Sequence, residues 1–148
     1  MKDLRQFYIN GQWVDPVQAR DLAVENPSTE ELVATISLGA AADVDAAVAA
    51  AKAAFPAYSK VSVEERIALM EKLLQIYKDR YDEMAVAISV EMGAPISFAT
   101  AAQADCGRGH INAAIESLKQ FEFERQVGNT RIVKEPIGVC GFITPWNW

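Results

Sequence analysis

The sequence predicts an α/β fold: short N-terminal strands, then three to four helices, then the first strand of a parallel sheet. Three observations support this prediction. Short strand-like runs separated by turn sequences fill the first forty residues. From Asp43 to about Phe121 the apolar residues recur at helical spacing, with many alanines. Residues 137–143 form an almost unbroken apolar run between Pro136 and Pro145, which is typical of a strand buried on both faces.

Two pairs of strands are expected near the N-terminus. Phe7–Ile9 and Gln12–Val14 flank Asn10-Gly11, a pair that favours a two-residue hairpin turn because both positions tolerate positive φ. Residues 21–25 and 32–37 are two further candidate strands, and the sequence between them has the residues of a turn. These runs predict a small strand region before the helices.

The first two helices are predicted from their N-terminal residues and their apolar positions. Asp43 suits the positive end of a helix dipole, although no Ser or Thr precedes it as a cap. Ser62-Val-Glu-Glu65 is a capping box that begins the second helix. An apolar stripe follows it, and we expect this stripe to face a sheet; its residues are Ile67, Met70, Leu74, Tyr77 and Tyr81.

The remaining helical sequence is less regular. One segment ends at Gly93, and Pro95 follows two residues later, as is usual after a helix. The next runs from Ser97 to about Phe121, and we expect Gly107 and Gly109 to weaken it. Residues 130–135 then resume extended character before the apolar run. The predicted organisation is therefore 1–121 for strands and helices, 122–136 for an extended linking segment, and 137–148 for the first strand of a sheet.

Composition excludes several classes of function. The chain has 148 residues, of which 51% are hydrophobic, so it can form a core. With 14 basic against 20 acidic residues the net charge is −6, which argues against nucleic acid or an anionic membrane as partner. We find no run of 18 apolar residues and no signal peptide, so a cytoplasmic location is expected. Two cysteines are too few for a disulfide framework.

Four segments together resemble one protein family along essentially the whole chain. They are Phe7-Tyr-Ile-Asn-Gly-Gln-Trp-Val14, Glu25-Asn-Pro-Ser-Thr-Glu30, Glu91-Met-Gly-Ala-Pro95 and Pro136-Ile-Gly-Val-Cys-Gly-Phe-Ile-Thr-Pro-Trp-Asn-Trp148. The order of these segments and their amino-acid sequences are similar to those in the N-terminal part of aldehyde dehydrogenases. The resemblance implies that residues 1–121 pack on a cofactor-binding domain, that 122–136 support oligomer contacts, and that 137–148 begin a Rossmann-like sheet built by later sequence. We therefore expect an N-terminal fragment or a truncated gene product.

The resemblance also implies a reaction. Enzymes of this family oxidise a small-molecule aldehyde to a carboxylic acid with NAD⁺ or NADP⁺, through a thioester on a cysteine. We expect the complete protein to do the same as a homo-oligomer. Because the matching nucleophile and general base lie outside these 148 residues, we expect the chain alone to be inactive. The acidic or small residue that selects between NAD⁺ and NADP⁺ also comes later.

Asn147 is the candidate catalytic residue. A neutral amide just beyond a strand end can donate N–H bonds to an oxygen that becomes negative during attack on a carbonyl, and the resemblance assigns this role to Asn147. The alternative is that the amide only caps the next turn or helix. By the same resemblance the residues before it line the cofactor, through backbone and apolar contacts; these are Ile143, Thr144, Pro145 and Trp146. The alternative for them is strand-end packing.

Other reactive side chains give weaker candidates, and we predict no metal site. Cys140 lies in the apolar run and is expected to be a buried packing residue. Cys106 and His110 are one helical turn apart, but two ligands do not make a metal site. Glu91 matches a position where some family members place a carboxylate for a structural cation, but a solvated carboxylate at a helix end is the preferred interpretation.

Two functions from another class remain open. The chain could be a non-catalytic interaction module that docks on a full-length relative through exposed apolar surface. It could also be a degenerate remnant that does not fold alone. An in-frame continuation with a suitable Cys and Glu would favour the enzyme over both.

Overall fold

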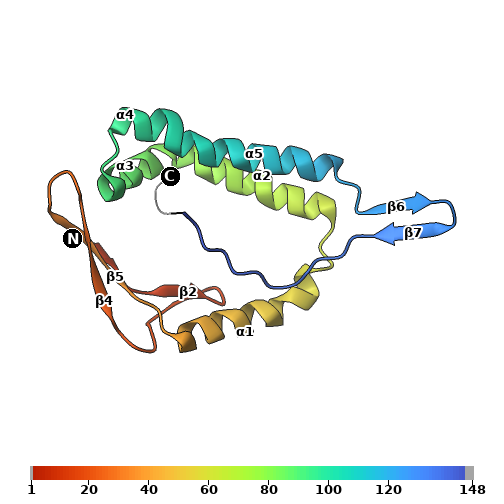
Figure 1. The fold of residues 1–148 in the computed structure, drawn as a ribbon, viewed down its shortest axis with the longest axis horizontal. Helices are drawn as coiled ribbons and strands as arrows, with labels where there is room; N and C mark the ends of the chain where they lie inside the picture. The colour runs from red at the N-terminus through yellow and green to blue at the C-terminus, as the bar shows by residue number, and fades with distance from the viewer. Residues whose placement is uncertain (1, 146–148) are drawn as a thin grey trace.

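The computed structural model describes residues 2–145 and combines short strands with a layer of helices. Figure 1 shows α2, α3 and α5 together on one side, and α1 with the N-terminal strands on the other. The strands are β1 (Lys2–Leu4), β2 (Phe7–Ile9), β3 (Gln12–Val14), β4 (Asp21–Glu25), β5 (Leu32–Ser37), β6 (Glu124–Val127) and β7 (Thr130–Val133). The helices are α1 (Ala41–Tyr58), α2 (Val63–Asp79), α3 (Tyr81–Met92), α4 (Ile96–Phe98), the π-helical turn η1 (Ala99–Gln103) and α5 (Ala104–Gln120).

The N-terminal strands follow the predicted turn chemistry. β2 and β3 form an antiparallel hairpin, and Asn10 and Gly11 have φ of 52° and 77°, as a two-residue turn of type I′ requires. β4 and β5 also pair antiparallel. The sequence did not reveal β1, which pairs parallel with β5, because its three exposed residues show no apolar alternation.

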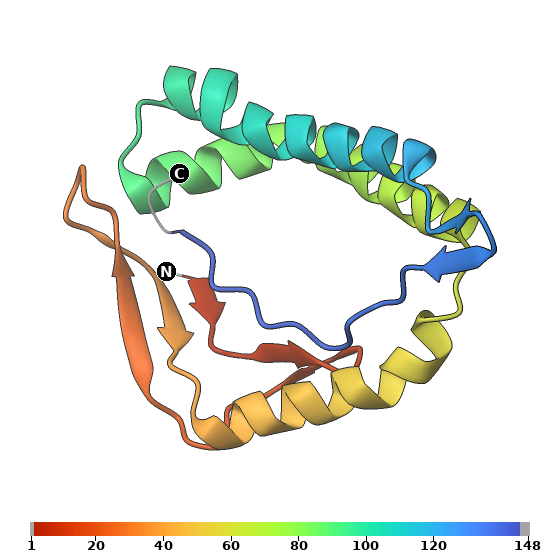
Figure 2. The same cartoon turned by 45° about the vertical axis from the view of Figure 1, so that its right-hand side comes forward.

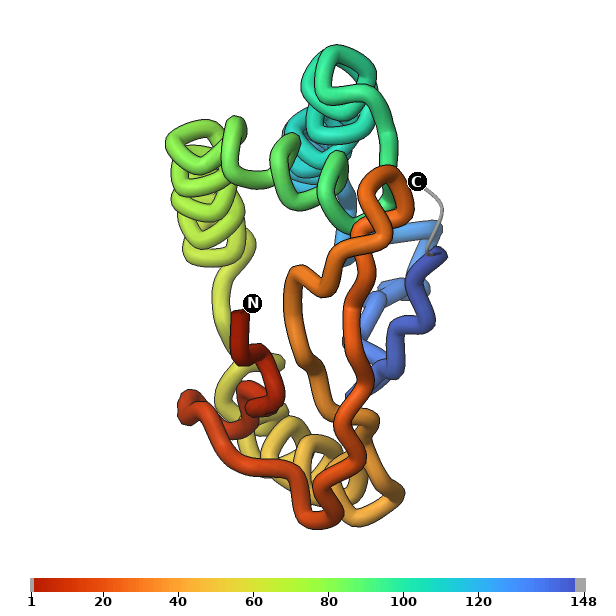
Figure 3. The backbone as a smooth tube through the Cα atoms, turned by 90° about the vertical axis from the view of Figure 1, so that its left-hand side faces the viewer, coloured from red at the N-terminus to blue at the C-terminus, as the bar shows by residue number. Residues whose placement is uncertain are grey.

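The hairpin of β4 and β5 connects the strand region with the helical layer. Figure 3 shows it rising from the level of α1 to the helices. At its tip the Asn26 side chain accepts a hydrogen bond from the Ser28 amide at 2.9 Å, which closes the turn. The tip lies against the end of α3, since a Cβ on Gly93 would stand 2.8 Å from Cγ of Pro27. Gly93 has φ of 74°, the left-handed conformation that ends a helix.

A buried carboxylate joins the strand region to α1. Asp43 is only 6% exposed and accepts hydrogen bonds from the Val17 amide at 2.8 Å and the Ala40 amide at 2.7 Å. These two bonds hold the pKa of Asp43 below its usual value. The carboxylate therefore supplies the N3 half of a capping box, at the Ala40 amide, and also fixes the loop after β3.

The predicted apolar stripe on α2 packs against a helix and not against a sheet, which corrects our expectation. α2 lies against α5, where Leu74 and Ile115 are 8% and 3% exposed. The nearest apolar surface available to α2 is on this later helix, so a sheet is not needed to cover the stripe. A second stripe on α2 stays exposed; it consists of Leu69, Leu73 and Ile76.

The expected linking segment forms a hairpin of its own. β6 and β7 pair antiparallel around Gly128, which has φ of 58°, as the first central residue of a type II′ turn requires. The base of the hairpin is attached to α2, where the Arg66 guanidinium lies 4.9 Å from the ring centroid of Phe123. On the same base, Lys134 Nζ lies 4.1 Å from the ring centroid of Phe121.

The predicted strand at 137–143 does not form within the described part of the chain. The segment after β7 runs without sheet pairing between the helical layer and the N-terminal strands (Figure 2). Ile137 and Phe142 are 94% and 90% exposed. A buried parallel strand needs hydrogen-bonded neighbours on its edges, and none of the strands between residues 2 and 145 pairs with this one.

Candidate functional site

The described part of the predicted site is an open, uncharged segment. Ile143 is fully exposed, and Thr144 and Pro145 are also exposed. Trp146 and the candidate catalytic residue Asn147 lie outside the described residues. The predicted cofactor and catalytic roles of this segment therefore stay predictions.

Residues 137–145 could supply only some of the contacts that bind a dinucleotide. The sequence from 137 to 145 offers apolar side chains and backbone groups without a partner strand, which suit contact with a nucleotide's apolar faces and polar edges. The same residues include no Lys or Arg, and they do not form the glycine-rich turn and helix N-terminus that hold a pyrophosphate. The segment could thus border a bound dinucleotide but cannot hold its phosphates.

The two cysteines occupy different environments, and neither is prepared as a nucleophile. Cys140 is exposed, which corrects the expectation of a buried packing residue; it is exposed because the strand that would have buried it is unpaired. An activated thiolate needs a base or a positive group beside it, and residues 137–145 contain neither. Cys106 is half-buried on α5, and His110 on the same helix is exposed.

The structure gives no support for a metal centre. Across residues 2–145 no group of three or more His, Cys, Asp or Glu side chains could hold a metal ion. Glu91 is exposed near the end of α3, as a solvated helix-end carboxylate would be. Within the same residues no helix is long and apolar enough to cross a membrane.

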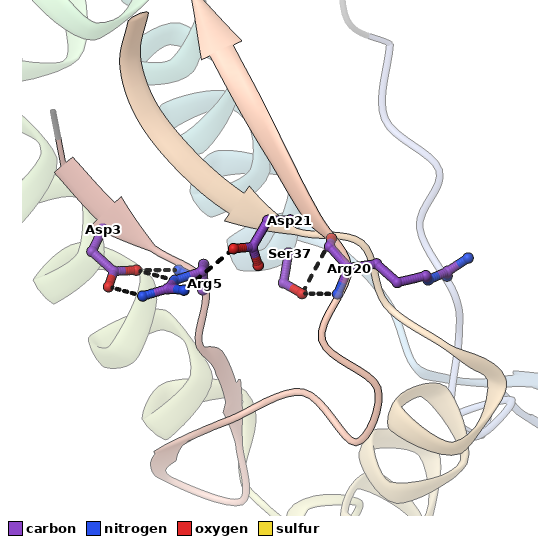
Figure 4. Close-up of polar contacts among 5 residues, drawn as sticks. All are labelled: Asp3, Arg5, Arg20, Asp21 and Ser37. Carbon is purple, nitrogen blue, oxygen red and sulfur yellow. Dashed lines mark hydrogen bonds and ion pairs between the residues drawn. The ribbon is translucent and has the colours of Figure 1, made fainter.

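A groove that the sequence did not predict lies beside β1, and both charged and apolar residues line it. It has a volume of about 1080 Å³ and is lined by β1, by the residues after it and by the segment that leads into β4. The Arg5 guanidinium donates to Asp3 at 2.9 and 2.7 Å and to Asp21 at 3.3 Å (Figure 4). The hydrogen bonds that Asp3 accepts from the guanidinium and the backbone amide of Arg5 lower the pKa of Asp3 to about 2. Because two carboxylates already bind Arg5, the groove offers no unpaired cation from that residue to an anionic ligand.

The neighbouring polar contacts in Figure 4 are structural. The Ser37 hydroxyl, 7% exposed as a residue, accepts from the Arg20 amide at 3.3 Å. The Arg20 guanidinium donates to the Gly39 carbonyl at 2.7 Å. These bonds hold the start of β4 against the end of β5. No lining residue of the groove comes from 137–145, so the groove is separate from the described part of the predicted site.

Comparison with known proteins agrees along the whole chain. The sequence profile described as "Aldehyde dehydrogenase family" matches residues 13–148. A 3-succinoylsemialdehyde-pyridine dehydrogenase from a Pseudomonas species is 48% identical over the full chain, and a putative aldehyde dehydrogenase from Staphylococcus aureus is 42% identical. The chain spans about 31% of the length of these curated relatives.

Solved structures give the same result. Aldehyde dehydrogenase C from Pseudomonas syringae, a mutant complexed with NAD⁺ and octanal, is 46% identical and has a TM-score of 0.95; the match covers 97% of this chain and 30% of that one. An aldehyde dehydrogenase from Bartonella henselae is also 46% identical, with a TM-score of 0.84 over 88% of this chain and 28% of that one. The strands, helices and four sequence segments thus follow the N-terminal part of a single fold. The chain belongs to the aldehyde dehydrogenase family, whose members are NAD(P)-dependent oxidoreductases.

Proposed function

We propose that these 148 residues form the N-terminal part of an enzyme that oxidises an aldehyde to a carboxylic acid with NAD⁺ or NADP⁺. The observation that carries the proposal is the family match over residues 13–148, which includes the Pro145-Trp-Asn147 run. The overlay on an aldehyde dehydrogenase complexed with NAD⁺ and octanal supports the same cofactor and substrate class. The complete enzyme is proposed to be cytoplasmic and a homo-oligomer.

Asn147 is proposed to act on the carbonyl oxygen of the aldehyde. When a thiolate adds to the carbonyl, negative charge develops on that oxygen, and an amide N–H aimed at it stabilises the transition state more than the ground state. Loss of one such donor typically lowers the rate by about 10²–10³-fold. Asn147 is neutral at all working pH values, so this contribution does not depend on its protonation.

The segment before Asn147 is proposed to border the cofactor. Ile143, Thr144, Pro145 and Trp146 would contact the dinucleotide through backbone groups and apolar surface, and the exposure of the first three is compatible with such contacts. The cofactor, when bound, accepts a hydride from the substrate. The contribution of this segment is to shape one side of the site and to exclude water from it.

The nucleophilic cysteine is proposed to lie outside these residues, in sequence that the longer relatives possess. Cys140 stands in a stretch without a neighbouring base or cation, and Cys106 belongs to the packed helix α5. We therefore propose that the chain by itself oxidises no aldehyde. Purified chain, incubated with NAD⁺ or NADP⁺ and several aldehydes, should give no reduced cofactor above a sample prepared from host cells without the gene.

A chimeric enzyme tests the proposal directly. The N-terminal third of the Pseudomonas syringae relative would be replaced by residues 1–148, and octanal oxidation would be followed by absorbance of the reduced cofactor. We expect activity in the chimera and a loss of about 10²-fold or more in kcat with Asn147→Ala. Gln18→Ala, in the exposed loop before β4, is the matched amide control and should leave kcat unchanged. A folded, active chimera that tolerates Asn147→Ala would refute the catalytic role.

The exposed apolar stripe on α2 favours a second candidate function. Leu69 and Leu73 are 54% and 52% exposed, and a helix face of this kind is normally covered. The chain could therefore be a non-catalytic module that docks on a full-length relative. Co-purification of tagged chain with the full-length Pseudomonas syringae enzyme distinguishes the two: a stable mixed complex without activity of the chimera would favour docking.

A further inference from the structure

The helical run from Ile96 to Gln120 changes its hydrogen-bond pattern at one place. In an α-helix the Ala104 amide would donate to the carbonyl of Thr100, four residues earlier. In the structure it donates to the Ala99 carbonyl, five residues earlier, which makes residues 99–103 the π-helical turn η1. The Thr100 carbonyl consequently has no amide of Ala104 to accept.

A tyrosine side chain from an earlier helix donates a hydrogen bond to that carbonyl. The Tyr81 hydroxyl, at the start of α3, donates to the Thr100 carbonyl at 2.5 Å. The Tyr77 hydroxyl, four residues earlier on α2, donates to the Ala104 carbonyl at 2.8 Å. The two rings are in edge contact, with centroids 6.3 Å apart. The two tyrosine hydroxyls therefore bind one carbonyl within η1 and one at the start of α5.

The π-turn also brings Ala99 and Ala104 to the same face of the run, and Gln103 beside them is buried at 6% exposure. Ala99 and Ala104 are both completely buried, at 0% exposure. In an uninterrupted α-helix, five residues advance by about 500°, which would leave Ala104 about 140° away from Ala99 around the axis. From Ala104 onward the pattern is α-helical: Ile115 follows eleven residues later, about 20° from the same line, and is 3% exposed. Within η1 the buried face of the run thus shifts by one residue toward the C-terminus.

We propose that η1 is a one-residue insertion that sets the rotational register of α5, and that the Tyr81 hydroxyl stabilises it by bonding to the carbonyl that the insertion releases. On one side of the insertion η1 packs against α3, and on the other α5 packs against α2. Both of these helix contacts can form only if the run between them contains one residue more than a regular α-helix would need. A plain α-helix of the same sequence would turn Ile115 and its neighbours away from α2 by about 100°.

Two single-residue deletions test the proposal in the 148-residue chain. Deleting Ala101, an exposed residue of η1, converts the turn to an α-helix and keeps both faces in place. Deleting Ala113, an exposed residue of α5, rotates Ile115 by about 100° out of its contact. Hydrogen–deuterium exchange of α5 peptides is the readout, because it does not require a cooperative melting transition. We expect protection close to wild type for the first deletion and about tenfold or greater loss for the second.

The role of Tyr81 is tested in both backgrounds. Tyr81→Phe should speed exchange in η1 and α3 in the wild-type chain. In the chain without Ala101 it should have a smaller effect there, because the Thr100 carbonyl then regains its α-helical donor and only the interaction of Tyr81 with Asp105 is lost. Tyr58→Phe is the control, since Tyr58 is 56% exposed at the end of α1. Equal loss of protection from the two deletions would overturn the insertion, and an equal Tyr81→Phe effect in the two backgrounds would overturn the role of the hydroxyl.

Discussion

Gly107 is the position at which a single methyl group is expected to have the largest effect on stability. It lies on α5 against Tyr77 of α2, and a Cβ at this position would stand 2.7 Å from Cζ of the tyrosine ring and closer still to its hydroxyl oxygen. Gly109 is two residues later on the same helix, and a Cβ there would meet nothing within 4 Å. The two glycines therefore form a matched pair that differs in one contact.

The expected free energies have opposite signs at the two positions. Replacing a helix-interior glycine by alanine stabilises a helix by about 1 kcal/mol, so Gly109→Ala should raise the free energy of unfolding by about that amount. At Gly107 the same gain is offset by overpacking, which typically costs about 1–3 kcal/mol. Displacing Tyr77 also weakens its hydrogen bond to the Ala104 carbonyl, worth about 1 kcal/mol. Gly107→Ala should therefore be destabilising by roughly 1–3 kcal/mol.

Thermal unfolding monitored by far-UV circular dichroism measures both variants. With about 2–8 °C per kcal/mol for domains of this size range, Gly107→Ala should lower the melting temperature and Gly109→Ala should raise it. Tyr77→Phe in the Gly107→Ala background removes the nearest atom and should recover part of the loss. Equal melting temperatures for the two alanine variants would show that α2 and α5 do not approach as closely as described, and the reasoning would fail.

Three further predictions concern the cap, the catalytic amide and the exposed helix face. Because hydrogen bonds from the Val17 and Ala40 amides hold the pKa of Asp43 down, its contribution to stability is present above about pH 4 and is lost as the pH falls further. In Asp43→Asn the melting temperature should depend less on pH in that acidic range. A dependence on pH equal to that of the wild type would contradict this. In a complete enzyme, Asn147→Ala should lower kcat by about 10²-fold with nearly unchanged dinucleotide affinity, measured by steady-state kinetics and cofactor titration; weaker cofactor binding with normal kcat would count against the assignment. Leu73→Gln should reduce self-association of the isolated chain in light scattering, because Leu73 is 52% exposed in an apolar stripe, and a wild-type chain that is already monodisperse would refute the premise.

Local turn and cap chemistry made most of the individual elements predictable. Asn10-Gly11 fixed the first hairpin, Ser62 and Glu65 began α2 through their reciprocal bonds at 3.1 and 2.9 Å, and Gly93 ended α3. These signals depend on a few adjacent residues, so tertiary contacts did not override them. The strand β1 had no comparable signal, because its three exposed residues, Lys2–Leu4, show no apolar alternation.

Long-range packing was predicted less well. Of the stripe predicted on α2, Leu74 is buried, and the last predicted residue, Tyr81, begins α3 instead. Periodicity gives the face of a helix and not its partner, so α5 was missed. Gly107 was expected to weaken a helix, whereas it permits the close approach of Tyr77. The apolar run at 137–143 has the composition of a central strand, yet composition cannot supply its neighbours. For the candidate site, the sequence motif names Asn147, and nothing between residues 2 and 145 tests that assignment.

The local pairing of the strands has a consequence for folding during synthesis. Each of the three hairpins pairs strands that are close in sequence, so little chain must be ordered before each contact forms. Hairpins form in about 1–10 μs, whereas a ribosome adds about 5–20 residues per second. The strand region of a nascent family member can therefore be complete many seconds before most of the polypeptide exists. Because these strand contacts are local, this part of the molecule is suited to folding early during synthesis.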